Sequence, residues 1–433
     1  MNVADSERAA TRLRSAGYEL TDSSEGADVL IFNTCSVREK AERKVFQRIN
    51  HVRRERAGKQ PLIGIMGCVA QLEGRAVFDS SPPVRFVIGT GATDRIPELL
   101  ERVEDGEERV SDLGIRQETE VWDVSPVERH SKHIAFVPVI EGCNKFCTYC
   151  IVPYSRGRER SRTAAEIVTE VRHLSDLGYK EVQLIGQNVN SYRPKAVDGL
   201  EKFSGATPFS KLLRAVASTG IPRIKFTTSF PRDFHPDIVG AIEENENLCN
   251  WIHLPVQTGS NRVLRAMRRG HQIEDYWKHV ETIKNARRRI SLTSDIIVGF
   301  PCETAEDFAD TLGLVERCRF DGLYIFKYSE RKGTPAARLT DSVSASEKAS
   351  RFITLERLQT SVQEGIYNSY VGSEVTVLVE GASARASVDM TGHTACNKVV
   401  NFRGTSGLVG RLVRVRVTEA KPHSLYGEFL GAM

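Results

Sequence analysis

Residues 141–150 read Glu-Gly-Cys-Asn-Lys-Phe-Cys-Thr-Tyr-Cys, and the interpretation of the whole chain depends on this stretch. It places Cys143, Cys147 and Cys150 at C-x3-C-x2-C spacing, directly after an apolar, strand-like run at 134–140. Thiolates are the ligands that iron–sulfur clusters favour, and a loop of this length can wrap three of them around one corner of a cubane. No fourth cysteine follows nearby. One iron of such a cluster would therefore be open to a small molecule, as in catalytic metal sites.

Two other interpretations of these cysteines stay open. A structural zinc site could combine them with His130 or His133, although zinc motifs usually pair two close CxxC knuckles. A disulfide framework is less favoured, because nine cysteines is an odd number and no apolar signal segment opens the chain. No apolar run reaches the roughly 18 residues that cross a membrane. We therefore expect a reducing, cytoplasmic environment and no membrane partner.

The length and composition are those of an ordinary soluble protein. With 433 residues the chain exceeds the size of a single hydrophobic core, which predicts about two or three domains. Hydrophobic residues make up 40% and charged residues 27%, as in typical globular domains. The net charge of +4 permits nucleic-acid binding without arguing for it, because such binding depends on where the charges cluster.

Strands and helices alternate from the start of the chain, which predicts an open, mostly parallel α/β sheet. A helix over 5–16 comes first with no strand before it, so the sheet is expected to lack its first strand. The predicted strands that follow are 28–33, 62–66 and 84–89. The charged stretch 105–128 has little apolar periodicity and is predicted to be a linker.

Two further cysteines stand at equivalent places in this first domain. Cys35 ends one predicted strand and Cys68 ends the next. Ligands of open α/β sheets gather outside the carboxyl ends of the strands, and helix N-termini favour thiolate. Either cysteine alone is as well explained as a packing residue. Their matched positions favour a shared metal site.

The segment from the cysteine loop onward predicts a partial (βα)6 barrel. Six strand-like segments alternate with amphipathic helices. They are 134–140, 181–185, 223–227, 251–254, 292–298 and 323–327. Parallel barrels carry their chemistry at the carboxyl ends of the strands. Polar residues collect there, and although each alone is best read as a loop residue or helix cap, together they indicate a rim over a cofactor.

An alternating basic run follows the cysteine loop, with Arg156, Arg158, Arg160 and Arg162 at every second position. A solvated basic face is the default interpretation of such a run. Its place beside a predicted cluster makes contact with a phosphodiester substrate the alternative.

The pattern changes near the carboxyl end. A long helix is predicted over 347–370, and after it the apolar period switches from 3.6 to 2, as in 375–379 and 412–417. Short alternating strands separated by glycines predict a small β-barrel of the kind that binds single-stranded nucleic acid.

Several of these motifs together resemble one enzyme family. The cysteine loop, with Tyr149 before its last cysteine, resembles the radical S-adenosylmethionine (SAM) enzymes, in which the open iron chelates SAM. Within them, the segments around Cys35 and Cys68 are similar to the methylthiotransferases, and two later segments are similar to the TRAM domain of the tRNA-acting branch. The segments are Asn33-Thr34-Cys35-Ser36-Val37-Arg38, Gly67-Cys68-Val69-Ala70-Gln71, Asn397-Lys398-Val399-Val400-Asn401-Phe402 and Ser424-Leu425-Tyr426-Gly427.

The resemblance covers essentially the whole chain and implies three domains. These are a flavodoxin-like domain at 1–104, a radical SAM barrel at 129–365 and a TRAM β-barrel at 368–433, and a linker at 105–128 joins the first two. The family carries another cysteine in its first domain. That residue would lie two positions before Met1, so this chain either lacks it or has its true start upstream, which we favour.

The resemblance also implies two 4Fe–4S clusters and SAM as cofactors. The radical SAM cluster would use Cys143, Cys147 and Cys150, and the auxiliary cluster Cys35, Cys68 and the cysteine missing before Met1. Residues expected to contact SAM or order its pocket are Gln187, Asn188, Gln257, Ser260 and Asp295. Residues expected to contact RNA are Arg156, Arg158, Arg160 and Arg162. Cys302 replaces a glycine of the family, and the remaining cysteines, Cys249, Cys318 and Cys396, are predicted core thiols.

The implied reaction adds a methylthio group to C2 of N6-isopentenyladenosine beside the anticodon of tRNA, after SAM cleavage to a 5′-deoxyadenosyl radical. The auxiliary cluster would supply sulfur and a second SAM the methyl group. The implied partners are the tRNA anticodon stem-loop and an electron donor such as flavodoxin or ferredoxin, and we expect a monomer. Alternatives are threonylcarbamoyl-adenosine or a ribosomal protein as the substrate, or a zinc-stabilised RNA-binding protein without catalysis.

Overall fold

The computed structural model describes residues 1–36, 39–55, 60–114, 129–196, 199–384, 386 and 388–433. The chain divides into two compact units. The first comprises Met1–His130, Glu141–Phe146 and Cys150–Arg160, and the second comprises Ser131–Ile140, Cys147–Tyr149 and Ser161–Met433. Within the described residues, no helix is long and apolar enough to cross a membrane.

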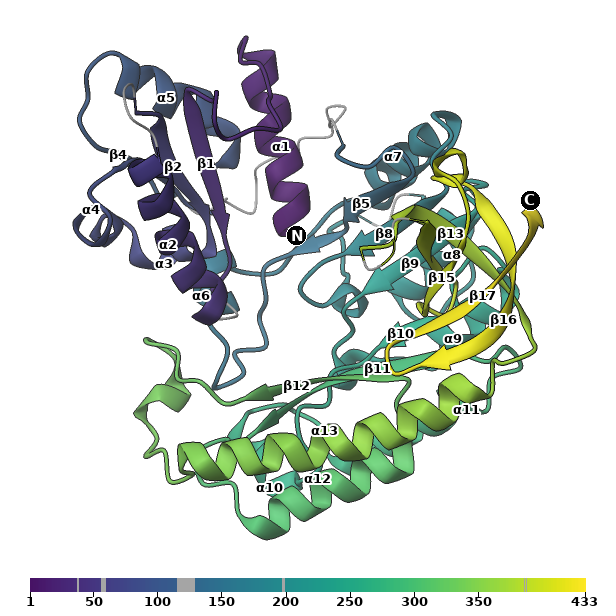
Figure 1. Cartoon of the computed structure of the whole chain (residues 1–433). Helices are drawn as coiled ribbons and strands as arrows, with labels where there is room; N and C mark the ends of the chain where they lie inside the picture. Colours follow the sequence, from purple (N-terminus) through teal and green to yellow (C-terminus); the bar gives the residue numbers. More distant parts are fainter. Residues whose placement is uncertain (37–38, 56–59, 115–128, 197–198, 385, 387) are drawn as a thin grey trace. The chain divides into compact units, whose positions relative to one another are not determined.

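The first unit contains a parallel sheet in the order β1-β2-β3-β4 (Figure 1). Its strands are β1 (Val29–Thr34), β2 (Leu62–Gly67), β3 (Val84–Ile88) and β4 (Val110–Asp112). Its helices are α1 (Asn2–Ser15), α2 (Glu39–Glu55), α3 (Cys68–Glu73), α4 (Ala76–Ser80), α5 (Ile96–Glu104) and α6 (Val152–Arg156). The predicted α/β sheet is confirmed.

The two faces of this sheet bury different residues of the same strands. Ile65 packs in a cluster with Ile49 of α2, whereas its neighbour Met66 packs in a cluster with Leu13 of α1 and Leu100 of α5. Successive side chains of a strand point to opposite faces, so apolar residues at every position predict a strand that is buried on both sides. This unit is therefore a sheet between two layers of helices.

The linker prediction for 105–128 is wrong for its first part. Val110 is 1% exposed and pairs with Phe86 of β3, so Val110–Asp112 extends the sheet of the first unit. This strand presents a single apolar residue, which gives no periodicity to detect. Residues 115–128 lie outside the described part of the chain.

The second unit contains six parallel strands in two three-stranded sheets, β5-β8-β9 and β10-β11-β12. The strands are β5 (Ile134–Pro138), β8 (Glu181–Ile185), β9 (Arg223–Thr227), β10 (Trp251–His253), β11 (Ser291–Val298) and β12 (Gly322–Lys327). The helices between them are α7 (Ala164–Asp176), α8 (Pro208–Ala217), α9 (Asp237–Glu244), α10 (Asn261–Ala266), α11 (Ile273–Lys284) and α12 (Ala305–Cys318). The two-residue strands β6 (Ile140–Glu141) and β7 (Arg160–Ser161) flank the cysteine loop.

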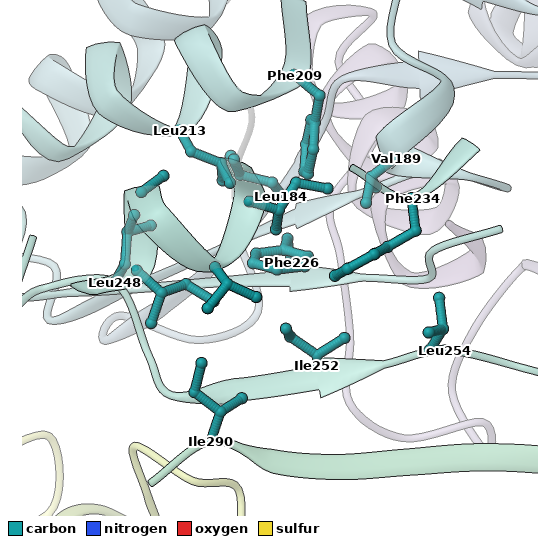
Figure 2. Packing of buried hydrophobic residues seen from close by; sticks show 14 of the residues in the cluster. Leu184, Val189, Phe209, Leu213, Phe226, Phe234, Leu248, Ile252, Leu254 and Ile290 are labelled. Carbon is teal, nitrogen blue, oxygen red and sulfur yellow. The ribbon is translucent and has the colours of Figure 1, made fainter. Parts of the chain in front are cut away.

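The partial (βα)6 barrel is thus confirmed, and its core lies between strands and helices. Figure 2 shows Leu184 of β8 and Phe226 of β9 packing with Phe209 and Leu213 of α8. Phe209 and Phe226 meet edge to face with ring centroids 5.5 Å apart. Local signals start the helices: Thr163 accepts a hydrogen bond from the backbone N–H of Glu166 and forms a capping box with it.

A small closed β-barrel ends the chain, as predicted. The long helix α13 (Ala345–Asn368) leads into it. Its strands are β13 (Glu374–Ala382), β14 (Asp389–Thr394), β15 (Val399–Arg403), β16 (Leu412–Lys421) and β17 (Ser424–Ala432), in the order β13-β14-β15-β17-β16. In β16, Val413 and Val415 are fully buried while Arg414 between them is exposed, which is the period of 2 seen in the sequence.

Buried polar contacts attach this β-barrel to the amino-terminal ends of the strands of the parallel barrel. The ammonium of Lys398 lies 2.6 Å from Asp321, just before β12, and 2.8 Å from Ser291, the first residue of β11. Arg223, the first residue of β9, donates to the carbonyl oxygen of Thr394 at 2.8 Å. Lys398 is 2% exposed. The β-barrel therefore occupies the end of the parallel barrel that lies opposite the carboxyl ends of its strands.

Candidate functional site

The first cysteine of the loop is positioned by a close approach of two backbone segments within the first unit. Cys143 donates its N–H to the carbonyl oxygen of Gly157 at 3.1 Å and is 7% exposed. Gly142 has φ +77°, and a Cβ there would lie 2.0 Å from the carbonyl oxygen of Arg158. Only glycine fits this approach. Cys150, in the same unit, is half-buried just before α6.

The middle cysteine belongs to the second unit. Cys147 is 6% exposed, and the next residue, Thr148, donates its N–H to Met267 at 3.0 Å and its hydroxyl to Ala266 at 2.9 Å. The carbonyl oxygen of Thr148 accepts the N–H of Ala336 at 2.8 Å. The segment around Cys147 is therefore held by the residues that follow β10 and β12, beyond the carboxyl ends of these strands.

Arg269 lies beside Cys147 and was not predicted as a site residue from the sequence. Its guanidinium lies 3.5 Å from the sulfur of Cys147 and 3.5 Å from the hydroxyl of Tyr149. It donates to the carbonyl oxygen of Pro255 at 2.5 Å and sits 4.4 Å from the centre of the Phe230 ring. A cation beside a cysteine favours the thiolate form that binds iron. In the sequence Arg269 looks like one of many basic residues in a helical stretch.

The donor chemistry of the loop fits an iron–sulfur cluster. Cys143 and Cys147 are buried, and a cation lies beside the Cys147 sulfur. Among the described residues, no three His, Cys, Asp or Glu side chains are gathered closely enough to hold a metal ion. The assignment of Cys143, Cys147 and Cys150 as ligands thus remains a prediction from the sequence.

Cys35 and Cys68 follow paired ends of neighbouring strands, as predicted. Thr34, the last residue of β1, pairs with Gly67, the last residue of β2. Cys35 and Cys68 follow these two residues and therefore start from the same edge of the sheet. Thr34 ties the two ends together: its hydroxyl donates to Met66 at 2.6 Å and accepts the N–H of Val69 at 3.2 Å. Cys68 is 5% exposed and Cys35 is half-buried. Their role as cluster ligands stays a prediction.

The residues predicted to contact SAM have different surroundings. Ser260 caps α10 and donates to Asp307 at 2.6 Å, so its hydroxyl stabilises the fold. Asp295 lies 3.4 Å from the imidazole of His253. Gln257, at φ +82°, links β10 to β11 through its backbone, which donates to Asp295 and accepts from Ile297.

The ends of β8 and β9 present buried polar atoms that lack a partner among the described residues. They are Oε1 of Gln187, after β8, and Oγ of Ser229, after β9. These strand ends are neighbours, because Ile185 pairs with Thr227. Buried polar groups in native proteins are hydrogen-bonded to protein, water or a ligand, so these two oxygens are available to a polar ligand. Asn188 is also buried there. This arrangement fits a polar cofactor such as SAM.

The arginine run does not form a solvated face. Within the first unit, the guanidinium of Arg156 is 2.6 Å from Asp5, and the side chain is 6% exposed. Arg160 is largely buried, 3.8 Å from Glu141. Within the second unit, Arg162 pairs with Glu170 at 2.6 Å and is 4% exposed. These ion pairs remove Arg156 and Arg162 from the predicted RNA contacts, whereas Arg158 is exposed.

The remaining cysteines divide by exposure. Cys249, Cys318 and Cys396 are buried, as expected of core thiols. Burial raises the pKa of Cys318 to about 12 and also raises the pKa of Cys249, so both stay protonated. Cys302 is exposed instead, and its φ of +70° explains why a glycine suits this position in the family.

His271 gives this region a pH dependence. Burial, and then the charge of Arg269, lower its pKa to about 4, from an ordinary value near 6.5. Below about pH 6.5 the imidazole of His271 binds a proton in the unfolded chain, whereas in the folded chain it stays neutral down to about pH 4. The free energy of unfolding should therefore fall as the pH drops toward about 4. We expect His271→Gln to flatten this fall, measured as urea midpoints between pH 7 and 5. Parallel curves for the two proteins would contradict the expectation.

Comparison with known proteins identifies the parts of the chain. Residues 137–315 match the radical SAM superfamily, residues 1–89 match the uncharacterized protein family UPF0004, and residues 368–430 match the TRAM domain. Among solved structures, the radical SAM methyltransferase TsrM from Kitasatospora setae has a similar fold. The TM-score is 0.59 at 14% identity, over 77% of this chain and 74% of that one.

Curated relatives are similar along their whole length. The chain is 44% identical to the tRNA-2-methylthio-N(6)-dimethylallyladenosine synthase of Solibacter usitatus, over 99% of this chain and 95% of that protein. It is 40% identical to the Koribacter versatilis protein of the same name, over 100% of this chain and 96% of that protein. The resemblance seen in the motifs is confirmed, and the chain belongs to the tRNA-2-methylthio-N(6)-dimethylallyladenosine synthase family of radical SAM enzymes.

Proposed function

We propose that the protein transfers a methylthio group to C2 of N6-dimethylallyladenosine beside the anticodon of tRNA. The observation that carries this proposal is the similarity over nearly the full chain to enzymes named for that reaction. The C-x3-C-x2-C loop and the terminal β-barrel supply the two parts that such an enzyme needs, a radical site and an RNA-binding module.

The parallel barrel provides the groups that would hold the first cluster and SAM. When bound, a 4Fe–4S cluster and SAM together supply the one-electron chemistry that activates a C–H bond. Cys143, Cys147 and Cys150 would be the protein ligands. Arg269, 3.5 Å from the Cys147 sulfur, favours its thiolate form. The unpaired oxygens of Gln187 and Ser229 would receive polar groups of SAM.

Cys35 and Cys68 would hold the auxiliary cluster of the first domain. Their strands end in register, so both thiols start from one edge of the sheet. Glycine at position 67 is required there, because a Cβ would lie 2.6 Å from the carbonyl oxygen of Thr34.

The proposed enzyme has three domains and two partners, a tRNA and an electron donor. The first domain would extend through β4 to about residue 114, because that strand belongs to its sheet, and the other two would span 129–365 and 368–433. The target adenosine lies in a loop, where single-stranded RNA can be opened and stacked, and the TRAM β-barrel would bind nearby RNA. A flavodoxin or ferredoxin would supply electrons to a monomeric enzyme in the cytoplasm, where thiols stay reduced.

Mass spectrometry of tRNA nucleosides tests the reaction. A strain that lacks this gene should accumulate N6-dimethylallyladenosine, and expression of the gene should restore the methylthio form. Loss of the methylthio form of threonylcarbamoyl-adenosine instead would assign the other tRNA substrate. An unchanged tRNA profile together with a change in a ribosomal protein would reject the tRNA activity.

A further inference from the structure

A basic groove lies on the second unit, at the amino-terminal ends of β11 and β12. It has a volume of about 490 Å³ and is formed by the ends of α11 and α12 and the last turn of α13. Four cations line it: Lys284, Arg289, Arg317 and Arg319. Asp321 is the one acidic residue in this lining. The proposed reaction gives this groove no role.

The single carboxylate does not neutralise the groove. Asp321 is 8% exposed, lies 2.6 Å from the ammonium of Lys398 and accepts the N–H of Leu292 at 3.0 Å. Lys284 is a more distant neighbour at 3.8 Å. Arg317 forms an ion pair with Glu281 at 3.2 Å. Because Lys398 already balances Asp321, the other three lining cations, Lys284, Arg289 and Arg319, leave a net positive charge.

Two of these arginines, Arg289 and Arg319, lie beside neutral groups. Arg289 donates to the hydroxyl of Ser369 at 3.0 Å and lies 4.6 Å from the centre of the Tyr370 ring. Arg319 ends α12 in the left-handed region, with its guanidinium 3.6 Å from the place of a Cβ on Gly365. In the described part of the chain, neither arginine forms an ion pair with a carboxylate. Both keep their full charge for a ligand.

We propose that this groove binds backbone phosphates of the tRNA. Planar guanidinium groups match the geometry of phosphate oxygens and donate two hydrogen bonds at once. The groove is also next to the TRAM module, because α13 leads through Ser369 into β13. This inference rests on the proposed tRNA substrate and adds a second, sequence-independent contact to it.

The location argues against an acidic electron donor as the occupant. The groove adjoins Ile290 and Asp321, which precede β11 and β12, so it lies at the amino-terminal ends of these strands. Cys147 is held beyond the carboxyl ends of β10 and β12. A strand of eight residues is about 26 Å long. A donor docked in the groove would be remote from the cluster, whereas a tRNA is large enough to contact both places.

The test uses full-length, reconstituted protein with the double substitution Arg289→Gln/Arg319→Gln. We expect roughly tenfold weaker tRNA binding at physiological salt, and a slope of log affinity against log salt that is smaller by about two. The matched control is Lys278→Gln/Arg287→Gln, whose side chains are 75% and 80% exposed nearby and do not line the groove. The control should stay within about twofold of wild type.

Measurements of tRNA turnover distinguish tRNA binding in the groove from binding of the electron donor there. The groove variant should show a raised KM for tRNA with an unchanged kcat at saturating tRNA, using dithionite as the reductant. Wild-type affinity and salt slope in the groove variant would overturn the inference. So would a defect seen with flavodoxin but not with dithionite, which would assign the groove to the electron donor. If wild-type protein binds tRNA but never modifies it, the proposed function fails while the binding comparison still decides the groove.

Discussion

We expect that replacing Cys147 with serine will remove about four irons per chain from the reconstituted protein, the content of one cubane, and will abolish formation of the methylthio product. Serine is a poor ligand for a cluster that favours thiolate, and the three-cysteine loop has no spare ligand nearby. Product formation should drop below detection, because the open iron that binds SAM is lost. Iron and sulfide analysis after anaerobic reconstitution, with product measured by mass spectrometry, checks both effects.

Cys302→Ser is the matched control for this substitution. Cys302 is exposed and belongs to no predicted ligand set, so its iron content and activity should equal those of wild type. Full iron and activity in the Cys147→Ser protein would contradict the ligand assignment. Stoichiometric zinc in the wild-type protein, in place of iron, would reject the radical mechanism and favour the zinc alternative.

We expect that replacing Arg156 with methionine will destabilise the first unit by about 3–5 kcal/mol, the usual cost of leaving a buried charge without its partner. The guanidinium of Arg156 is 2.6 Å from Asp5 and 3.2 Å from the amide oxygen of Asn2. Burial alone would raise the pKa of Asp5, but the charge and the hydrogen bond of Arg156, together with smaller effects of other nearby cations, hold that pKa below its ordinary value. Without Arg156, Asp5 must be buried uncompensated or take up a proton.

Hydrogen exchange of the α1 amides measures this effect locally, which suits a chain of several domains. The double variant Asp5→Asn/Arg156→Met should recover much of the loss, because it removes both charges. The contribution of the pair to stability is present above the ordinary pKa of Asp5 and is lost as the pH falls through its lowered pKa. If Arg156→Met leaves exchange unchanged and weakens tRNA binding instead, the sequence-based assignment to RNA contact was right.

Elements with strong periodicity were predictable from the sequence. The strand at Glu181–Ile185 has the predicted bounds, because its apolar residues Val182, Leu184 and Ile185 stand between the polar Lys180 and a glycine that interrupts the pattern. The strand at Val110–Asp112 was missed, because it is stabilised by pairing with β3 rather than by a pattern of its own. Pairing between distant segments leaves no local signal.

The candidate site likewise combines residues that the sequence predicted with residues that only the fold brings together. Cys143, Cys147 and Cys150 were found from their spacing alone, because three ligands on one loop are a local feature. Arg269 lies 122 residues from Cys147 in sequence, and nothing in its neighbours distinguishes it from the basic residues around it. The unpaired oxygen of Ser229 likewise becomes visible only when β9 is paired with its neighbours.

Most of the element order, the cysteine loop and the family could be predicted from the sequence, because these depend on residue types at short spacings. The tertiary structure alone decided what the charged residues do. Arg156 and Arg162, basic residues in one run, are both buried against carboxylates. Lys398, part of a motif that resembled an RNA-binding module, is buried against Asp321. A charge looks the same in any sequence, and its role depends on whether folding brings it a partner or leaves it in water.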